Sequence, residues 1–152
     1  MKTTGNIFRV FLDTSALLSG LNSPIGGAGI ILALFTLQEI EISISPEVVM
    51  EAKRNILTKF SRLETAFLAF LIGNPIVTEK ITHKELHAAY HIIPSEDAPI
   101  AAGALKARAE AIITLDRRFQ KLAQQNNFPL SILTPGEFLE QYRKKSLSFT
   151  SF

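Results

Sequence analysis

Acidic side chains are the residues of this sequence whose types and spacing could do chemistry. Asp13 and Asp116 each directly follow an apolar run. Asp97 heads an alanine-rich segment, and Glu51 lies in an amphipathic one. Carboxylates that meet in one cleft repel one another and raise each other's pKa. A divalent cation relieves that repulsion: hard oxygen ligands select Mg²⁺ or Mn²⁺, and such a site can activate water for attack on a phosphodiester.

Hydroxyl and basic residues stand beside the first and the last of these acids. Thr14 and Ser15 follow the first, and Thr114 precedes the last by two positions. Their hydroxyls could hold a metal-bound water or a phosphate oxygen, or could bond only to the turns in which they lie. Arg117 and Arg118 directly follow the last acid. If the substrate is a nucleic acid, they could contact its phosphate backbone next to the phosphodiester bond that is cleaved.

Each acid also has an ordinary structural explanation. An Asp after a strand often bonds to turn amides, and an acid at a helix N-terminus favours the helix dipole. Glu51 could be a solvated helix charge, because Lys53 and Arg54 lie beside it. Taken singly, such explanations are the commoner ones. The case for a shared site is that three independent carboxylates are expected at one rim.

The apolar runs are typical of strands buried on both faces of a parallel sheet. Ser45-Pro46, Thr82-Glu85 and Thr134-Glu137 are typical helix starts. The alternation of strands and helices predicts one α/β domain with a mainly parallel sheet and helices on both faces. The expected strands are 7–12, 41–44, 76–78, 111–115 and 130–133, and the expected helices are 29–38, 45–60, 61–72, 82–90, 95–110, 117–125 and a last one from 134.

This fold would position the acids. In an open parallel sheet, ligands bind outside the carboxyl ends of the strands, where the strand order reverses. If the strands before Asp13 and Asp116 are neighbours, these two carboxylates stand side by side. Asp97 belongs to the same edge, because a helix running back along the sheet begins there. Glu51 could face inward from its own helix.

The composition is that of an ordinary globular domain. Of 152 residues, 47% are hydrophobic and 20% are charged, and the net charge of +2 permits an anionic partner. The chain contains no cysteine, which excludes disulfides and thiolate sites. No signal-peptide pattern is present, and no apolar run approaches the ~20 residues of a membrane span. We therefore expect a soluble, cytoplasmic protein with no membrane partner.

Three sequence blocks resemble the PIN-domain family of metal-dependent ribonucleases: LDTSALL, SPEVVMEA and SEDAPIAAGALKARAEAIITLDRRF. The resemblance spans residues 7–140. It is carried by the order of the blocks and by the last one, in which an acid heads a helix and an apolar strand ends in Thr-x-Asp and an aromatic residue. It implies a three-layer α/β/α sandwich, formed by a nuclease domain at 1–142 and followed by a flexible tail at 143–152.

The resemblance also implies the roles of the acidic residues. The family's acids fall on Asp13, Glu51, Asp97 and Asp116, with Glu47 as an alternative for the second. Asp13, Asp97 and Asp116 would bind one or two Mg²⁺ or Mn²⁺ ions, while the hydroxyls of Thr14, Ser15 and Thr114 would support them. The implied activity is endonucleolytic cleavage of RNA. Many single-domain members are VapC-like toxins that pair with an antitoxin, often as homodimers.

Other functions remain open at this stage. The fold could serve as an RNA- or protein-binding regulatory module with weak or absent cleavage. Asp13 could be a phosphoacceptor, as in receiver-type or phosphatase-like proteins, although no Asp-x-Asp follows the first strand. His83, His87 and His91 have spacings that occur in metal sites, but their neighbours favour a surface helix. The glycines at 26–29 lack the Lys-Ser/Thr of a phosphate-binding loop.

Overall fold

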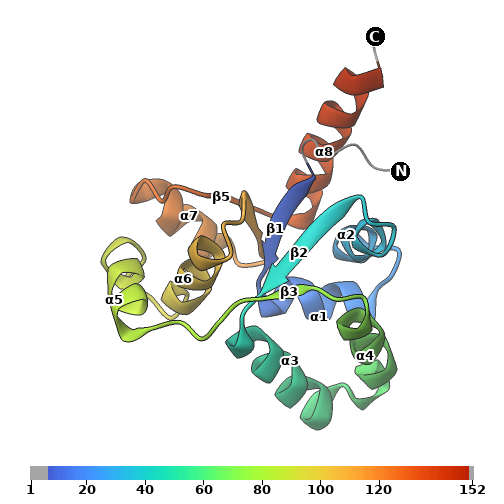
Figure 1. Ribbon diagram of the computed structural model, residues 1–152, viewed down its shortest axis with the longest axis horizontal. Helices are drawn as coiled ribbons and strands as arrows, with labels where there is room; N and C mark the ends of the chain where they lie inside the picture. The colour runs from blue at the N-terminus through green and yellow to red at the C-terminus, as the bar shows by residue number, and fades with distance from the viewer. Residues whose placement is uncertain (1–6, 151–152) are drawn as a thin grey trace.

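A computed structural model describes residues 7–150, apart from the side chains of 146–150. In this part of the chain the sheet is built from β1 (Phe8–Leu12), β2 (Ile40–Ile44), β3 (Ile76–Val77), β4 (Ala111–Ile113) and β5 (Ser131–Leu133). The strand order is β3-β2-β1-β4-β5, and every pair is parallel (Figure 1). The predicted α/β/α fold with a mainly parallel central sheet is confirmed.

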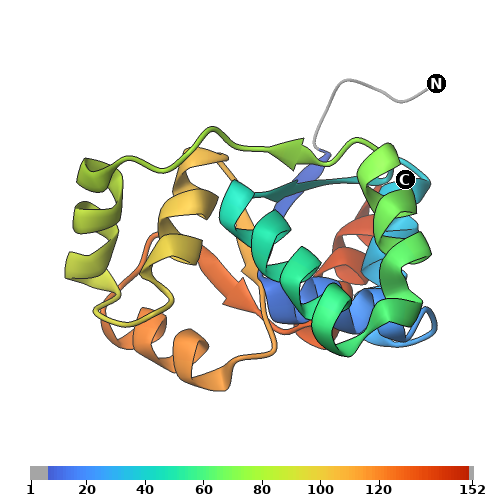
Figure 2. The same ribbon diagram turned by 90° about the horizontal axis from the view of Figure 1, so that it is seen from below.

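Helices cover both faces of the sheet. They are α1 (Thr14–Asn22), α2 (Gly27–Thr36), α3 (Pro46–Lys59), α4 (Glu64–Ile72), α5 (His83–Ile92), α6 (Ala98–Lys106), α7 (Arg117–Gln125) and α8 (Pro135–Thr150), with a short 3₁₀ turn, η1 (Ser61–Leu63). Figure 2 shows α5, α6 and α7 on one side and α1, α2, α4 and α8 on the other. The chain adds β2 and β3 on one side of β1 and then returns to add β4 and β5 on the other. Right-handed crossovers in opposite directions place their helices on opposite faces.

The centre of the core is β1, which is covered on both faces as its apolar sequence predicts. Val10 and Phe11 are both 0% exposed. The ring of Phe11 faces Gly103 of α6, where an added Cβ would lie only 2.9 Å from the ring. The absence of a side chain at Gly103 therefore lets α6 approach the sheet closely. Phe119 of α7 is also fully buried.

The predicted helix starts form as expected. Ser45 caps α3 by accepting a hydrogen bond from the Val48 amide. Thr82 and Glu85 form a reciprocal capping box at α5. At α8 the Glu137 amide donates to the Thr134 hydroxyl, and the Thr134 amide donates back to Glu137 Oε1. These local bonds satisfy amides that no helical carbonyl can reach.

The structure differs from the expectations in the first helices. Helix α1 begins directly after Asp13, in a segment to which we assigned no element because Thr, Ser and Gly favour turns. Leu57 of α3 is 66% exposed, whereas Val48 and Ala52 of the same helix are fully buried. Its position lies on the edge of the apolar stripe, where helix rotation decides burial.

Two later helices also differ. The helix expected at 95–110 forms only as α6, since Ser95–Asp97 make a turn and Arg108 adopts a positive φ of 56° that ends the helix. The last helix, α8, runs from Pro135 to Thr150 and so crosses position 142. The domain limit at 142 and the flexible tail at 143–152 stay predictions, and residues 151–152 lie outside the described residues.

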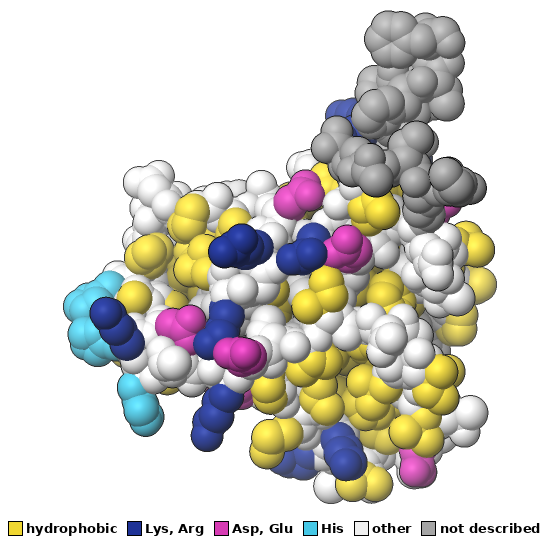
Figure 3. All heavy atoms as spheres, viewed as in Figure 1, with side chains coloured by type: hydrophobic (Ala, Val, Ile, Leu, Met, Phe, Trp, Pro, Cys, Tyr) yellow, Lys and Arg dark blue, Asp and Glu magenta, His cyan; other side chains and the backbone are white. Residues whose placement is uncertain are grey.

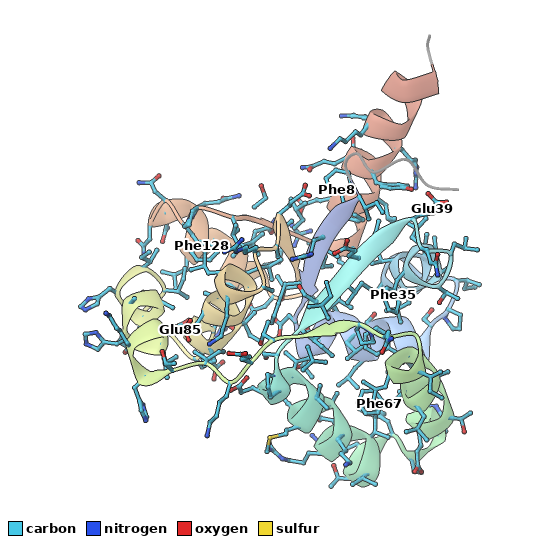
Figure 4. All side chains as sticks on the ribbon, in the orientation of Figure 1. Phe8, Phe35, Glu39, Phe67, Glu85 and Phe128 are labelled. Atoms are coloured by element: carbon cyan, nitrogen blue, oxygen red, sulfur yellow. The ribbon has the colours of Figure 1, made fainter. Side chains whose placement is uncertain are left out.

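The surface carries three further features. No single helix among the described residues is long and apolar enough to cross a membrane; α1 and α2 reach that length only together, with an 88° bend. The histidines lie exposed on the outer side of α5, where the rings of His87 and His91 meet edge to face (Figure 3). Phe35 of α2 packs against Phe70 of α4, joining the helices at one end of the sheet (Figure 4).

The close contact at Gly103 yields a stability prediction. We expect Gly103→Ala to lower the free energy of unfolding by about 1–3 kcal/mol, because the new methyl group would overpack Phe11. Gly136→Ala is the matched control, since an added Cβ there meets no atom within 4 Å. Urea denaturation followed by circular dichroism measures both. Equal stability of the two variants would contradict the tight packing of α6.

Candidate functional site

Asp13 stands at the point where β1 ends and α1 begins. Its amide donates to the carbonyl of Ile113 on β4 (3.0 Å), which continues the parallel pairing of the two strands. Its side chain accepts two hydrogen bonds, from the Thr14 amide (2.7 Å) and from the Thr114 hydroxyl (2.8 Å). The carboxylate is half-buried, and one hydrogen bond fixes each of its two oxygens.

Asp116 occupies the equivalent place after β4 and caps α7. Its Oδ1 accepts from the amides of Arg118 (2.9 Å) and Phe119 (3.3 Å). The Thr114 hydroxyl accepts from the Asp116 amide (3.0 Å) while it donates to Asp13. One hydroxyl thus links the acids at the ends of the two neighbouring strands.

Asp97 reaches the site from α6, which lies on the face of the sheet opposite to α1. It is the residue directly before α6, but its side chain makes no bond to the first turn of that helix. Instead the Ser95 hydroxyl lies 3.4 Å from Oδ2 of Asp97 and accepts from its amide at 3.1 Å. A carboxylate that does not cap its helix remains free for another ligand.

Glu51 reaches the site from α3. Glu51 is exposed as a residue, but its Oε2 accepts a hydrogen bond from the hydroxyl of Thr14, which is buried (3.1 Å). Ser15 accepts from the Leu115 amide (3.3 Å). The hydroxyls of Thr14 and Thr114 therefore orient carboxylates, and that of Ser15 bonds to a turn. A further contact of these hydroxyls with phosphate or metal-bound water stays a prediction.

A cavity of about 510 Å³ joins these residues. It is lined by Asp13, Thr14, Ser15, Leu18, Glu51, Asn55, Glu96, Asp97, Ile100 and Asp116. The structure thus brings all four predicted acids to one hollow, together with Glu96, which we did not single out. Its place beside Asp97, in the sequence Ser-Glu-Asp, was the available signal.

The charges in this cavity repel one another. The pKa of Asp13 is raised by burial and by Glu51 and Asp116, although its hydrogen bonds to Thr114 and Thr14 oppose the rise. Burial, Asp116 and Asp13 raise the pKa of Asp97 to about 6. Like charges therefore act on both Asp13 and Asp97 in this cavity, and Asp116 contributes to the rise at each.

The basic residues we singled out lie at the rim. Arg117 and Arg118 are both exposed in the first turn of α7, directly after Asp116. One guanidinium nitrogen of Arg117 is 3.9 Å from a carboxylate oxygen of Glu137, whose group is held by Thr134 and Gln120. Arg118 points to solvent without such a partner among the described residues.

Comparison with known proteins decides the family. A family model described as PIN domain matches residues 9–118, which include the four acids. The chain belongs to the PIN-domain family. No protein with a curated description matches this PIN domain.

Solved structures share its fold. VapBC2 from Rickettsia felis, solved with a DNA fragment from its promoter, has a TM-score of 0.60 at 16% identity, covering 84% of this chain and 98% of that one. FitAcB from Neisseria gonorrhoeae gives 0.55 at 17% identity, with 83% and 97% covered. PAE2754 from Pyrobaculum aerophilum gives 0.56 at 15% identity, with 86% and 92% covered. At these identities the likeness is one of fold.

PIN domains generally use divalent metal ions, and the donor set of this one fits such an ion. The cavity offers carboxylate oxygens, which suit Mg²⁺ or Mn²⁺. Among the described residues, no three acidic or histidine side chains are grouped closely enough to chelate an ion by themselves.

The repulsion yields a prediction about stability and pH. The pKa of Asp97 in the folded protein is about 6, against an ordinary value of 3.8. Its stabilising contribution is therefore complete below pH 3.8 and is lost as the pH rises through 6. Without divalent cations, we expect Asp97→Asn to raise the melting temperature at neutral pH by about 2 °C or more and to flatten its fall between these pH values.

Thermal melts in EDTA and in Mn²⁺ test this prediction. Mn²⁺ should stabilise the wild-type protein more than Asp97→Asn, because the variant has lost one ligand and part of the repulsion. Glu79→Gln is the matched control, an exposed acid outside the cavity. A pH profile of Asp97→Asn that overlays the wild-type profile would show that Asp97 does not sense its neighbours.

Proposed function

We propose that this PIN domain is an Mg²⁺- or Mn²⁺-dependent endoribonuclease that hydrolyses phosphodiester bonds in RNA. The observation that carries the proposal is the meeting of four acids from distant parts of the chain in one cavity, where the neighbouring carboxylates help to raise the pKa of Asp13 and of Asp97. Carboxylates gathered against their own repulsion are unfavourable unless a cation occupies the site in use.

Asp13, Asp97 and Asp116 would hold the cation, and Glu51 would hold it or orient water. A bound divalent cation lowers the pKa of water and stabilises negative charge on phosphate oxygens. The protein's own contribution is to fix the donors beforehand. The Thr114 and Thr14 hydroxyls hold Asp13 and Glu51 in place. Glu51 is the most exposed of the four, which suits a group that positions an attacking water.

The chain's partners follow from the same proposal. The relatives VapBC2 and FitAcB are toxin–antitoxin complexes. We infer that this PIN domain is the toxin of such a pair, held inactive by an antitoxin protein and forming a homodimer in the cytoplasm. A neighbouring small reading frame whose product copurifies with the chain and blocks hydrolysis would support this role.

Hydrolysis of a labelled RNA tests the nuclease. We expect cleavage in Mn²⁺, no cleavage in EDTA, and a loss of about 100-fold or more in rate for Asp13→Asn and for Asp116→Asn, because each removes a charge from the site. Glu110→Gln, an exposed acid outside the cavity, should leave the rate unchanged. Cleavage that survives EDTA, or that survives both Asp variants, would refute the proposal. Metal-independent RNA binding without turnover would favour the regulatory module.

Arg118 yields a separate prediction about salt. As a phosphate contact at the rim, it should release about one counterion on binding. We expect Arg118→Ala to weaken RNA binding for all sequences alike and to reduce the slope of log affinity against log salt by about 1. Lys84→Ala on α5, far from the cavity, is the control. A slope equal to that of the wild-type protein would remove Arg118 from the interface.

A further inference from the structure

A second, smaller pocket adjoins the acidic cavity. It has a volume of about 250 Å³ and is lined by Leu18, Ser19, Asn22, Phe60 and Leu63. Leu18 lines both hollows, so they meet across a single side chain. The acids lie at the N-terminal end of α1 and the small pocket at its C-terminal end, where α3 ends and η1 begins.

Helices α1 and α3 both line the acidic cavity, and α1 continues along the small pocket. They pack against each other, as Figure 2 shows. Ser15, Leu18, Ser19 and Asn22 follow the spacing i, i+3, i+4, i+7 and so share one face of α1. Ser15 and Asn22 are about 10 Å apart along the helix axis, which is about three nucleotides at the rise of a stacked strand.

The pocket has the composition of a site for one flat ring. Its volume lies below the range of sites for drug-sized ligands. The ring of Phe60 forms part of its wall, and the guanidinium of Arg62 lies over that ring, 5.8 Å from its centroid. An aromatic face with an adjacent Arg is the usual platform on which proteins stack an unpaired base.

The polar groups of the pocket are oriented by a hydrogen bond. A guanidinium nitrogen of Arg62 donates to Oδ1 of Asn22, which turns the amide nitrogen of Asn22 outward as a donor. Neither that nitrogen nor the hydroxyl of Ser19 has a hydrogen-bond partner within the described part of the chain. The polar groups that line the pocket can therefore donate, through the amide nitrogen of Asn22 and the hydroxyl of Ser19, and the guanidinium of Arg62 lies next to them.

Donors select the bases that present acceptors. Uracil and guanine carry a carbonyl oxygen where cytosine and adenine carry an amino group. We propose that the pocket formed by Leu18, Ser19, Asn22, Phe60 and Leu63 is a base subsite of the nuclease, which stacks one nucleotide of single-stranded RNA on Phe60 and prefers uracil or guanine. The subsite rests on the proposed function, because it binds part of the same substrate.

A protein side chain is the rival occupant. It would need only the apolar wall of Leu18, Phe60 and Leu63. It would have no use for the outward amide of Asn22, the hydroxyl of Ser19 and a cation at the mouth. These groups match a base edge and a phosphate, and the pocket shares Leu18 with the cavity of the acids that would cut the same strand.

Binding in EDTA tests the subsite apart from catalysis. Fluorescence anisotropy compares short oligouridylate with oligocytidylate, whose bases differ mainly in carbonyl against amino group. We expect the wild-type protein to prefer oligouridylate by about threefold to tenfold. Asn22→Asp replaces the donor with an acceptor and should reverse the preference. Phe60→Leu should weaken both oligonucleotides by about tenfold, because the stacking surface is lost.

Matched controls separate this effect from charge and folding. Asn74→Asp makes the same charge change at an exposed site beyond the pocket, and Phe35→Leu removes a ring from a different cluster. Both should keep the wild-type preference. Asn22 is exposed, so Asn22→Asp is expected to fold, and circular dichroism melts check it and Phe60→Leu.

The outcomes distinguish the subsite from the nuclease. Cleavage of an RNA pool in Mn²⁺, with a uracil or guanine preference near the cut that Asn22→Asp alone reverses, supports both. Reversal in binding without any cleavage supports the subsite and refutes the nuclease. Cleavage with a base preference that Asn22→Asp and Phe60→Leu leave unchanged overturns the subsite. Equal binding of both oligonucleotides by the wild-type protein also overturns it.

Discussion

The pairing of β1 with β4 is the constraint on which the rest of the molecule depends. These strands are distant in sequence but lie side by side, and the Asp13 amide extends their ladder to the carbonyl of Ile113. They also mark the point where the order of the strands reverses. Crossovers diverge there to opposite faces, so the carboxyl edge opens a hollow between α1 and α3 on one side and α6 on the other. Every acid of the site borders that hollow.

The charges of the acidic site lower the stability of the folded protein. Burial and like charges raise the pKa of Asp13 and Asp97, which means that their ionised forms are held at a free-energy cost. Hydroxyls and amides offset part of this cost. Thr114 serves Asp13 and the amide of Asp116 at once, and Thr14 serves Glu51. A hard cation is bound by oxygen ligands that are already held in place. The cation would supply the positive charge that offsets the repulsion between these carboxylates.

Helix α1 couples the acids to the proposed base subsite. Its first residues hold Asp13 and Glu51, while its last turn supplies Asn22 to the pocket beside Phe60. A rigid element of this kind sets the distance between the reacting phosphate and a stacked base. Sequence preference and catalysis would then arise from two ends of one helix, without a separate recognition domain.

Much of this could be predicted from local sequence. Apolar runs, capping boxes and the Ser45 cap identified the strands and most helix starts, because these signals act between residues only a few positions apart. The predictions of secondary structure that were wrong lie where local sequence preferences conflict with the structure that forms. Thr14 and Ser15 favour turns yet begin α1, and the alanine-rich segment around α6 stops at Arg108 only because the backbone turns there to enter β4.

The sequence by itself determined that the protein is a parallel α/β domain with acids after two of its strands. Both the hydrophobic periodicity and an acid directly after an apolar run can be recognised from residues that are close together in the sequence. Only the tertiary structure decided that Glu96 joins the cavity, that the Thr14 and Thr114 hydroxyls hold carboxylates, and that Asn22 and Phe60 share a pocket. Each of these depends on how helices pack across the sheet, and that packing is fixed by contacts between residues far apart in the chain.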